Sequence, residues 1–208
     1  MRRLDDETLQ VGIDVLCRQD RRLAALVKTH GRPPLWARPT GYATLLQVVL
    51  EQQVSLDSAK AIYERLRKEL RKVTPTTVLP LGVDGLRERG FTRQKAGYVI
   101  TMAQRIESGE LSLRKIALAD DAKAAELLLA EKGIGPWTAA IYLLMALCRP
   151  DIWPRGDIAL EIQLQALHGL KKRPVKDETD ALAEEWRPWR SVAARILWQA
   201  YLSERGRA

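Results

Sequence analysis

The helical spacing of apolar residues is the feature of this sequence that most restricts its fold. Apolar residues recur three and four positions apart over most of the chain, for example from Leu4 to Leu16 and across residues 92–109. No run alternates apolar and polar residues between turn signals, as a half-buried strand does. Short stretches containing Gly and Pro separate the helical segments. We therefore predict an all-α protein with short connections.

Residues that can accept hydrogen bonds from the first N–H groups of a helix mark where several helices begin. Ser55, Thr92, Asp120 and Asp157 each come directly before a helical segment. We predict that each of them is an N-cap.

One helical segment is interrupted by Gly133-Ile134-Gly135-Pro136 and resumes without a linker. A glycine ends a helix by taking a left-handed conformation, a second glycine permits close backbone approach, and proline suits the first turn of the next helix. Ile134 would then be the apolar pin between the two helices. Such a turn presents backbone N–H groups at a helix N-terminus, where anions bind. A tight corner between helices with no ligand would have the same local sequence.

The charge balance indicates what that anion is. The 208 residues include 34 Lys and Arg against 26 Asp and Glu, a net charge of +8, which favours a polyanionic partner such as nucleic acid. Two scattered cysteines and two histidines cannot form a zinc site or a four-cysteine cluster, so no metal is expected. No secretory signal or membrane span is evident, so we expect an intracellular, cytoplasmic protein. The length of the chain suits one domain or two packed lobes.

Longer stretches carry a resemblance to a known family. The segment "GIGPWTA" followed by the loop "PRGD", with Asp157 22 residues after Gly135, resembles the helix-hairpin-helix DNA glycosylases. "VVLEQQVSLDSA", "GFTRQKAGYV" and "WRPWRSVAARILW" are similar to the DNA-3-methyladenine glycosylase II branch of that superfamily. The resemblance extends over about residues 35–200, without the N-terminal β-rich domain that some relatives carry.

The resemblance implies a two-lobed glycosylase fold. Residues 40–148 would form the lobe that contains the hairpin, with the helix-hairpin-helix motif at about 121–147. Residues 1–39 and 149–208 would form the second lobe. The active site is expected in the cleft, with Asp157 at the joint, and one such site per chain suits a monomer.

Asp157 is the implied catalytic residue. Cleavage of a base–sugar bond builds positive charge on the sugar, which a fixed carboxylate stabilises, or the carboxylate activates the water that traps it. A helix cap without chemistry is the alternative interpretation. Trp137, Trp198 and Tyr142 are implied for an aromatic pocket that attracts a cationic alkylated base, although Ile141 stands where the family has Tyr.

The same resemblance assigns the DNA contacts. Gln53 would be the wedge that fills the place of the extruded base, and Gln52 would hold its loop. The alternative for Gln53 is a polar residue in an ordinary turn between helices. The hairpin residues Gly133, Ile134, Gly135 and Thr138 would bind phosphate, and a monovalent cation could bind at the same turn. No other cofactor is expected. Arg93, Lys95 and Arg155 are candidates for backbone contacts, with solvated surface as the alternative.

Trp137 also indicates what the protein does not do. Relatives with lyase activity carry Lys at this position, and Trp cannot form a Schiff base. We predict a monofunctional glycosylase that removes alkylated bases such as 3-methyladenine and 7-methylguanine from damaged double-stranded DNA. The alternatives are a glycosylase for deaminated or oxidised bases and a non-catalytic helix-hairpin-helix DNA-binding module.

Overall fold

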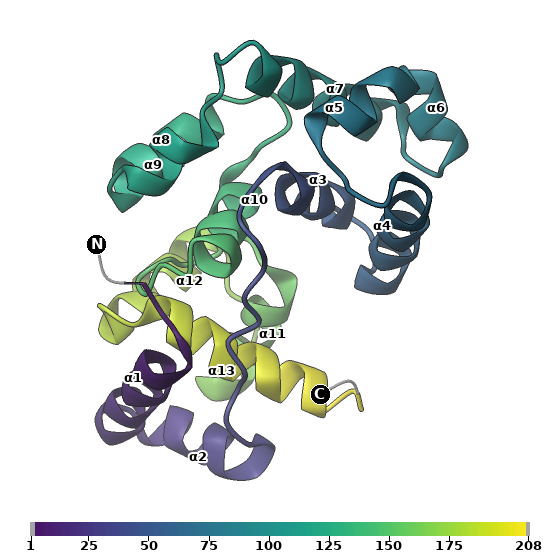
Figure 1. The fold of residues 1–208 in the computed structure, drawn as a ribbon. Coiled ribbons are helices and arrows are strands. Elements are labelled where there is room, and N and C mark those ends of the chain that lie inside the picture. The colour runs from purple at the N-terminus through teal and green to yellow at the C-terminus, as the bar shows by residue number, and fades with distance from the viewer. Residues whose placement is uncertain (1–2, 207–208) are drawn as a thin grey trace. The chain divides into compact units, whose positions relative to one another are not determined.

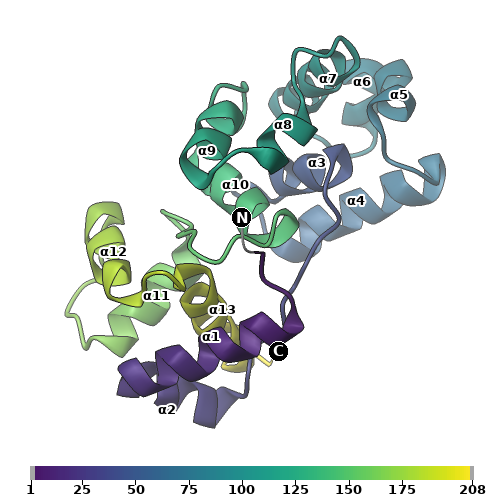
Figure 2. The ribbon, with the colours of Figure 1, turned by 60° about the vertical axis from the view of Figure 1, so that its left-hand side comes forward.

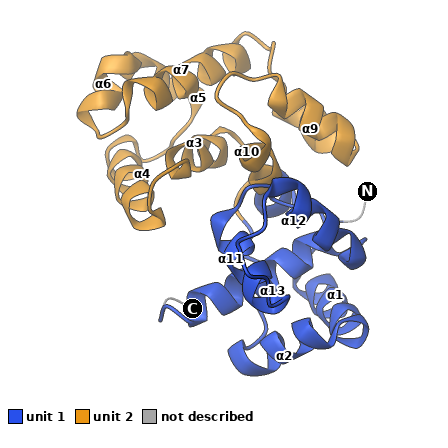
Figure 3. Ribbon diagram, turned by 180° about the vertical axis from the view of Figure 1, so that it is seen from behind, with its two compact units in different colours: residues 1–37, 143–208 blue, residues 38–142 orange. Residues whose placement is uncertain are grey.

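The computed structural model describes residues 3–206, and every regular element in this range is a helix (Figure 1). No strand occurs among these residues, which confirms the all-α prediction. Backbone contacts divide the chain into unit 1, residues 1–37 with 143–208, and unit 2, residues 38–142 (Figure 3). None of the described helices is long and apolar enough to cross a membrane.

The predicted N-caps are confirmed. Ser55, Thr92, Asp120 and Asp157 each accept, through the side chain, a hydrogen bond from the backbone N–H group three residues further on. This bond satisfies one of the N–H groups that the first turn of a helix leaves without a partner.

Unit 1 is built around one buried helix. Its elements are α1 (Asp6–Gln19), α2 (Arg21–His30), α11 (Ile158–Leu167), α12 (Lys176–Ala183), the 3₁₀ turn η3 (Glu184–Trp186) and α13 (Arg190–Ser203). Helix α13 packs against α1, α2 and α11 (Figure 2). Every residue of α13 from Ser191 to Trp198 is buried, as expected for a helix that is apolar on nearly all sides.

Unit 2 has α7 as its central helix. Its elements are α3 (Tyr42–Glu51), α4 (Leu56–Leu70), α5 (Pro75–Val78), the 3₁₀ turn η1 (Leu79–Leu81), α6 (Gly82–Glu88), α7 (Arg93–Glu107), α8 (Leu113–Leu118), α9 (Asp121–Leu129) and α10 (Pro136–Ile141). Helix α7 contacts α3, α5 and α6 (Figure 1). It buries Ala96, Val99, Met102 and Ala103.

The boundary that we expected near residue 148 lies after Tyr142 instead. The π-helical turn η2 (Tyr142–Ala146) continues α10 directly, and residues 143–148 belong to unit 1. The reason is the side chain of Arg195, which has no exposed surface and donates to the carbonyl oxygens of Leu35, Ser191 and Leu144 at 2.8–2.9 Å. Burial lowers the pKa of Arg195 to about 10. This guanidinium holds the start of the returning segment inside unit 1.

Candidate functional site

The hairpin between α9 and α10 has the geometry that its glycines predict. Gly133 adopts a left-handed φ of +90°, and the buried Ile134 donates its backbone N–H group to the carbonyl oxygen of Glu131 at 3.0 Å. Pro136 is the first residue of α10, and Gly135 is its N-cap. No side chain caps α10, because glycine has none to offer.

Gly133 is required at its position by a neighbour from α7. A Cβ atom there would lie 2.3 Å from two ring carbons of Tyr98, far inside van der Waals contact. The ring of Tyr98 therefore packs directly on the hairpin turn. This contact was missed from the sequence, because nothing in the α7 segment links Tyr98 to a turn 35 residues away.

The wedge turn, defined as residues 52–54, is held from two sides within unit 2. The side-chain amide of Gln52 donates to the carbonyl oxygen of Gly133 at 2.8 Å and to the hydroxyl of Thr138 at 2.9 Å. The ammonium of Lys95 donates to the carbonyl oxygens of Leu50 and Gln52, both at 2.7 Å. These contacts tie the end of α3 both to the hairpin and to α7.

Gln53 is presented by this turn. It is exposed and has a φ of +56°, a left-handed conformation that costs a non-glycine residue on the order of 1 kcal/mol. Strained backbone of this kind is maintained only where the surroundings enforce it. The hydrogen bonds of Gln52 and Lys95 supply that enforcement.

Two of the expected phosphate contacts therefore have other partners in the structure. Thr138 is only 2% exposed and its hydroxyl accepts from Gln52, so its side chain does not face solvent. Lys95 is occupied by two carbonyl oxygens, and burial lowers its pKa. The sequence could not show this, since a surface lysine and a helix-capping lysine have the same local pattern.

Unit 1 holds the candidate catalytic carboxylate. Asp157 is half-buried at the N-terminus of α11, after Gly156, which has a φ of +81°. Its Oδ1 atom accepts from the backbone N–H group of Leu160 at 3.1 Å and from the indole N–H group of Trp198 at 3.2 Å. Both donors fix the position of this oxygen.

Trp198 therefore contacts Asp157 as well as offering an aromatic surface. It lies on α13 and is 8% exposed. Because its indole nitrogen donates to the carboxylate, Trp198 orients Asp157. The sequence placed it in a base pocket but gave no sign of the hydrogen bond, which joins residues 41 positions apart.

The remaining predicted residues fall in different surroundings. Trp137 is half-buried in the first turn of α10. Tyr142 is 1% exposed and its hydroxyl accepts from the backbone N–H group of Gly41 at 3.1 Å, so it lies inside unit 2. Arg155 pairs with Asp177 and, at 3.2 Å, with Asp180, so two carboxylates already occupy its guanidinium. Arg93 is exposed at the start of α7.

A metal site is not evident in the part of the chain that the structure describes. Residues 3–206 contain no group of three or more His, Cys, Asp or Glu side chains that could hold a metal ion. At the hairpin, the carbonyl oxygen of Gly133 already accepts from Gln52. The monovalent cation at this turn stays a prediction.

Comparison with known proteins identifies the family. A family model described as "HhH-GPD superfamily base excision DNA repair protein" matches residues 46–188. The chain belongs to this superfamily. The match contains the wedge turn, the hairpin and Asp157, and so includes elements of both units.

Among its relatives, a Bacillus subtilis protein named "Putative DNA-3-methyladenine glycosylase YfjP" is 30% identical over 186 residues. The alignment covers 86% of this chain and 65% of the relative, so the chain spans about two thirds of that protein's length. In the same superfamily, the crystal structure of DNA-3-methyladenine glycosidase from Bacillus halodurans is similar with a TM-score of 0.76 and 27% identity, over 97% of this chain and 93% of that chain.

A second solved structure shows the same fold. The 3-methyladenine DNA glycosylase Mag1 of Schizosaccharomyces pombe, solved in complex with abasic DNA, has a TM-score of 0.80 and 24% identity. The similarity covers 94% of this chain and 95% of that chain. At this identity the likeness establishes the HhH-GPD fold of the chain.

Proposed function

We propose that this member of the superfamily is a monofunctional DNA N-glycosylase that excises alkylated bases. The observation that carries the proposal is the carboxylate of Asp157, which is oriented by a helix N–H group and by the indole of Trp198. The names of its relatives from Bacillus subtilis and Bacillus halodurans support the class of substrate.

The chemistry follows from the charges of the reacting groups. In 7-methylguanine or 3-methyladenine the base carries a positive charge, so the base–sugar bond breaks with its electron pair moving to the base, which leaves neutral. The sugar becomes cationic at C1′, and the carboxylate of Asp157 stabilises that charge. Water then adds to C1′ and loses a proton, which gives an abasic site and a free base.

The other proposed roles concern DNA binding. The hairpin turn would bind phosphate through backbone N–H groups at the start of α10, where the aligned peptide dipoles favour an anion. Gln53, exposed on its strained turn, would fill the space that the extruded base leaves. Trp198, which donates to Asp157, would bind the cationic base through its ring face.

The absence of lyase activity is proposed from Trp137. An indole has no amine that could attack C1′, so no covalent imine with the sugar forms at this position. The DNA strand should therefore stay intact after the base leaves.

A base-release assay tests the proposal. The protein is incubated with duplex DNA methylated at purines, and with separate duplexes that carry uracil, hypoxanthine or 8-oxoguanine. We expect release of 7-methylguanine and 3-methyladenine, strand breakage only after alkali, and no adduct trapped by borohydride. Release from the uracil, hypoxanthine or 8-oxoguanine duplexes alone would assign the protein to deaminated or oxidised bases. DNA binding without any release would make it a binding module, and a trapped adduct would contradict the monofunctional mechanism.

A further inference from the structure

Gly97 lies in the middle of α7, at a position where the structure does not require a glycine. Glycine destabilises a helix interior relative to alanine, because it gives the unfolded chain more freedom. Its φ is not in the left-handed range, and a Cβ atom built on Gly97 would meet nothing within 4 Å. Neither backbone conformation nor packing therefore requires a glycine here. At Gly133, by contrast, both do.

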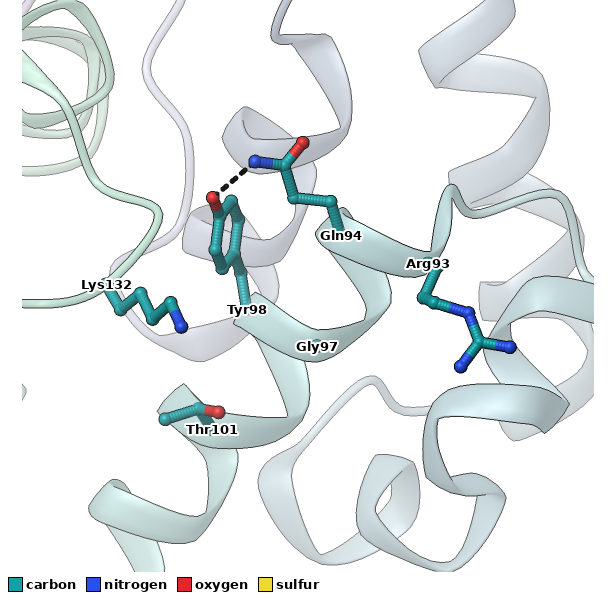
Figure 4. Close-up of a pocket in the computed structure, with 6 residues that line it drawn as sticks. All are labelled: Arg93, Gln94, Gly97, Tyr98, Thr101 and Lys132. Atoms are coloured by element: carbon teal, nitrogen blue, oxygen red, sulfur yellow. Dashed lines mark hydrogen bonds between the residues drawn. The ribbon is translucent and has the colours of Figure 1, made fainter.

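Gly97 lies in the floor of a pocket of about 330 Å³ in unit 2 (Figure 4). We call it the α7 pocket; its lining residues are Arg93, Gln94, Gly97, Tyr98, Thr101 and Lys132. Figure 4 shows Arg93 and Lys132 on opposite sides of Gly97. The lining offers a guanidinium, an ammonium, an amide and two hydroxyls, and it contains no carboxylate.

The two cations of the pocket are available to a ligand. Arg93 and Lys132 are both exposed, and neither forms an ion pair with any residue in the described range 3–206. The amide of Gln94 donates to the hydroxyl of Tyr98 at 2.6 Å, which fixes both groups on the pocket rim. An anion near Gly97 would therefore lie between two positive charges, one on each side of the glycine.

The position of the pocket relates it to the hairpin. Lys132 directly precedes Gly133, and the ring of Tyr98, another lining residue, packs on Gly133. A polymer with regularly spaced phosphates that is held at the hairpin is therefore the anion most readily presented to the pocket. Gly97 would let its sugar–phosphate backbone approach the helix more closely than any side chain permits.

We infer that the α7 pocket binds a backbone phosphate of the DNA that the hairpin binds, with Arg93 and Lys132 as the charged contacts and Gly97 as the point of close approach. The inference rests on the proposed function, since it names a further part of the same DNA-binding surface. The inference extends the proposed DNA-binding surface along α7 and explains why position 97 is a glycine.

The variant Gly97→Ala tests this inference, because it should raise the stability of the protein and lower its affinity for DNA. We expect a melting temperature a few degrees above that of the wild type, because alanine favours the helix. We expect affinity for an undamaged duplex to fall about threefold or more, because the methyl group keeps the phosphate away from its donors. Gly85→Ala in α6, a helical glycine of the same unit outside the pocket, is the control for affinity and should leave it unchanged. It is not a control for stability, because a Cβ there would lie 3.3 Å from the Cβ atom of Leu81.

The cations are tested through salt dependence. Arg93→Ala and Lys132→Ala should each lower the slope of log affinity against log salt by about one. Arg114→Ala, which removes an exposed arginine on α8 outside the pocket, should not change the slope. If Gly97→Ala and both cation variants bind as the wild type does, the inference is overturned.

These experiments distinguish a failure of the α7-pocket inference from a failure of the glycosylase proposal. Unchanged affinity in these variants together with normal base release would overturn the pocket and leave the glycosylase proposal intact. Weaker binding in the variants of a protein that releases no base would support the pocket and contradict the glycosylase proposal. Inorganic phosphate serves as a further probe: if it binds the isolated protein in the pocket and duplex affinity is unaffected by the variants, the site is one for free phosphate and the DNA assignment is wrong.

Discussion

Two aspartate–tryptophan pairs in unit 1 have the same local design and different surroundings. Asp20 is the N-cap of α2 and accepts from the indole N–H group of Trp186 at 3.0 Å. Asp157 is the N-cap of α11 and accepts from the indole N–H group of Trp198 at 3.2 Å. Each carboxylate thus combines a helix cap with one indole donor.

The surroundings separate the two pairs. Asp20 is 7% exposed, and the guanidinium of Arg22 donates to both of its oxygens at 2.9 Å. Although burial opposes ionisation, hydrogen bonds from Arg22 and Trp186 lower the pKa of Asp20 to about 2. Asp157 is more exposed, and its Oδ1 atom accepts from the backbone N–H group of Leu160 and the indole of Trp198. The comparison teaches that a buried capping carboxylate bonded to a guanidinium serves stability, whereas a more exposed capping carboxylate is suited to chemistry.

The largest expected effect is on catalysis by Asp157→Asn. Asparagine caps a helix as well as aspartate does, so folding and DNA affinity should persist. The rate of 7-methylguanine release should fall about 10²–10³-fold, since the charge that stabilises the cationic sugar is lost. Single-turnover base release and duplex binding measure the two effects.

Asp120→Asn is the matched control for this variant. Asp120 is the N-cap of α9 and accepts from the backbone N–H group of Lys123 at 2.8 Å. Its substitution should leave base release unchanged. Release at the wild-type rate by Asp157→Asn would show that the proposed mechanism is wrong.

A smaller effect, on stability, is expected for Asp20→Asn. A carboxyl group whose pKa is lowered by folding stabilises the folded state above its ordinary pKa near 4, and this contribution disappears as the pH falls through about 2. At neutral pH the variant should lose about 1–2 kcal/mol of unfolding free energy. The difference from the wild type should shrink between about pH 4 and pH 2, as followed by urea unfolding.

A base-release assay of Asp20→Asn distinguishes the role of Asp20 from that of Asp157. Asp20→Asn should release 7-methylguanine at the wild-type rate at a temperature where it is folded. A loss of activity in the folded variant would mean that the two pairs are not as distinct as their surroundings indicate.

The smallest expected effect comes from Trp198→Phe, which keeps an aromatic ring and removes the indole N–H group. Loss of one hydrogen bond to the carboxylate should lower kcat about three- to tenfold, with little change in KM. Trp198→Ala should in addition raise KM for methylated DNA, because the ring face that attracts a cationic base is gone.

Trp186→Phe removes the equivalent hydrogen bond from the first pair and should affect stability alone. If Trp198→Ala leaves the excision of alkylated bases unchanged, a pocket for neutral, deaminated or oxidised bases becomes the better interpretation.

The sequence predicted the parts of this structure that depend on neighbours within a few positions. The helices, the four N-caps and the conformation of Gly133 follow from bonds that span three or four residues or from the sterics of one residue. For the same reason the sequence located Asp157 at the start of a helix. The family resemblance added the roles proposed for Asp157, Gln53 and Trp137.

The partners of long side chains could not be predicted in this way. Lys95 and Arg155 were candidates for DNA-backbone contacts, with solvated surface as the alternative. In the structure Lys95 caps the end of α3 and Arg155 pairs with two carboxylates of α12. Arg195 donates to the carbonyl oxygens of Leu35 and Leu144, which lie far from it in the sequence, as well as to Ser191 on its own helix. A flexible side chain takes its partner from whatever packing brings within reach, and that is not encoded nearby.

The sequence by itself thus determined an all-α chain, a glycine-proline hairpin and a capping aspartate in a loop, because each arises from local backbone geometry. The tertiary structure decided which of the two aspartate–tryptophan pairs has a buried carboxylate bonded to an arginine and which has a more exposed carboxylate. It also decided that Gly133 is forced by the ring of Tyr98, whereas Gly97 faces open space. These distinctions depend on segments far apart in the chain, and only packing brings them together.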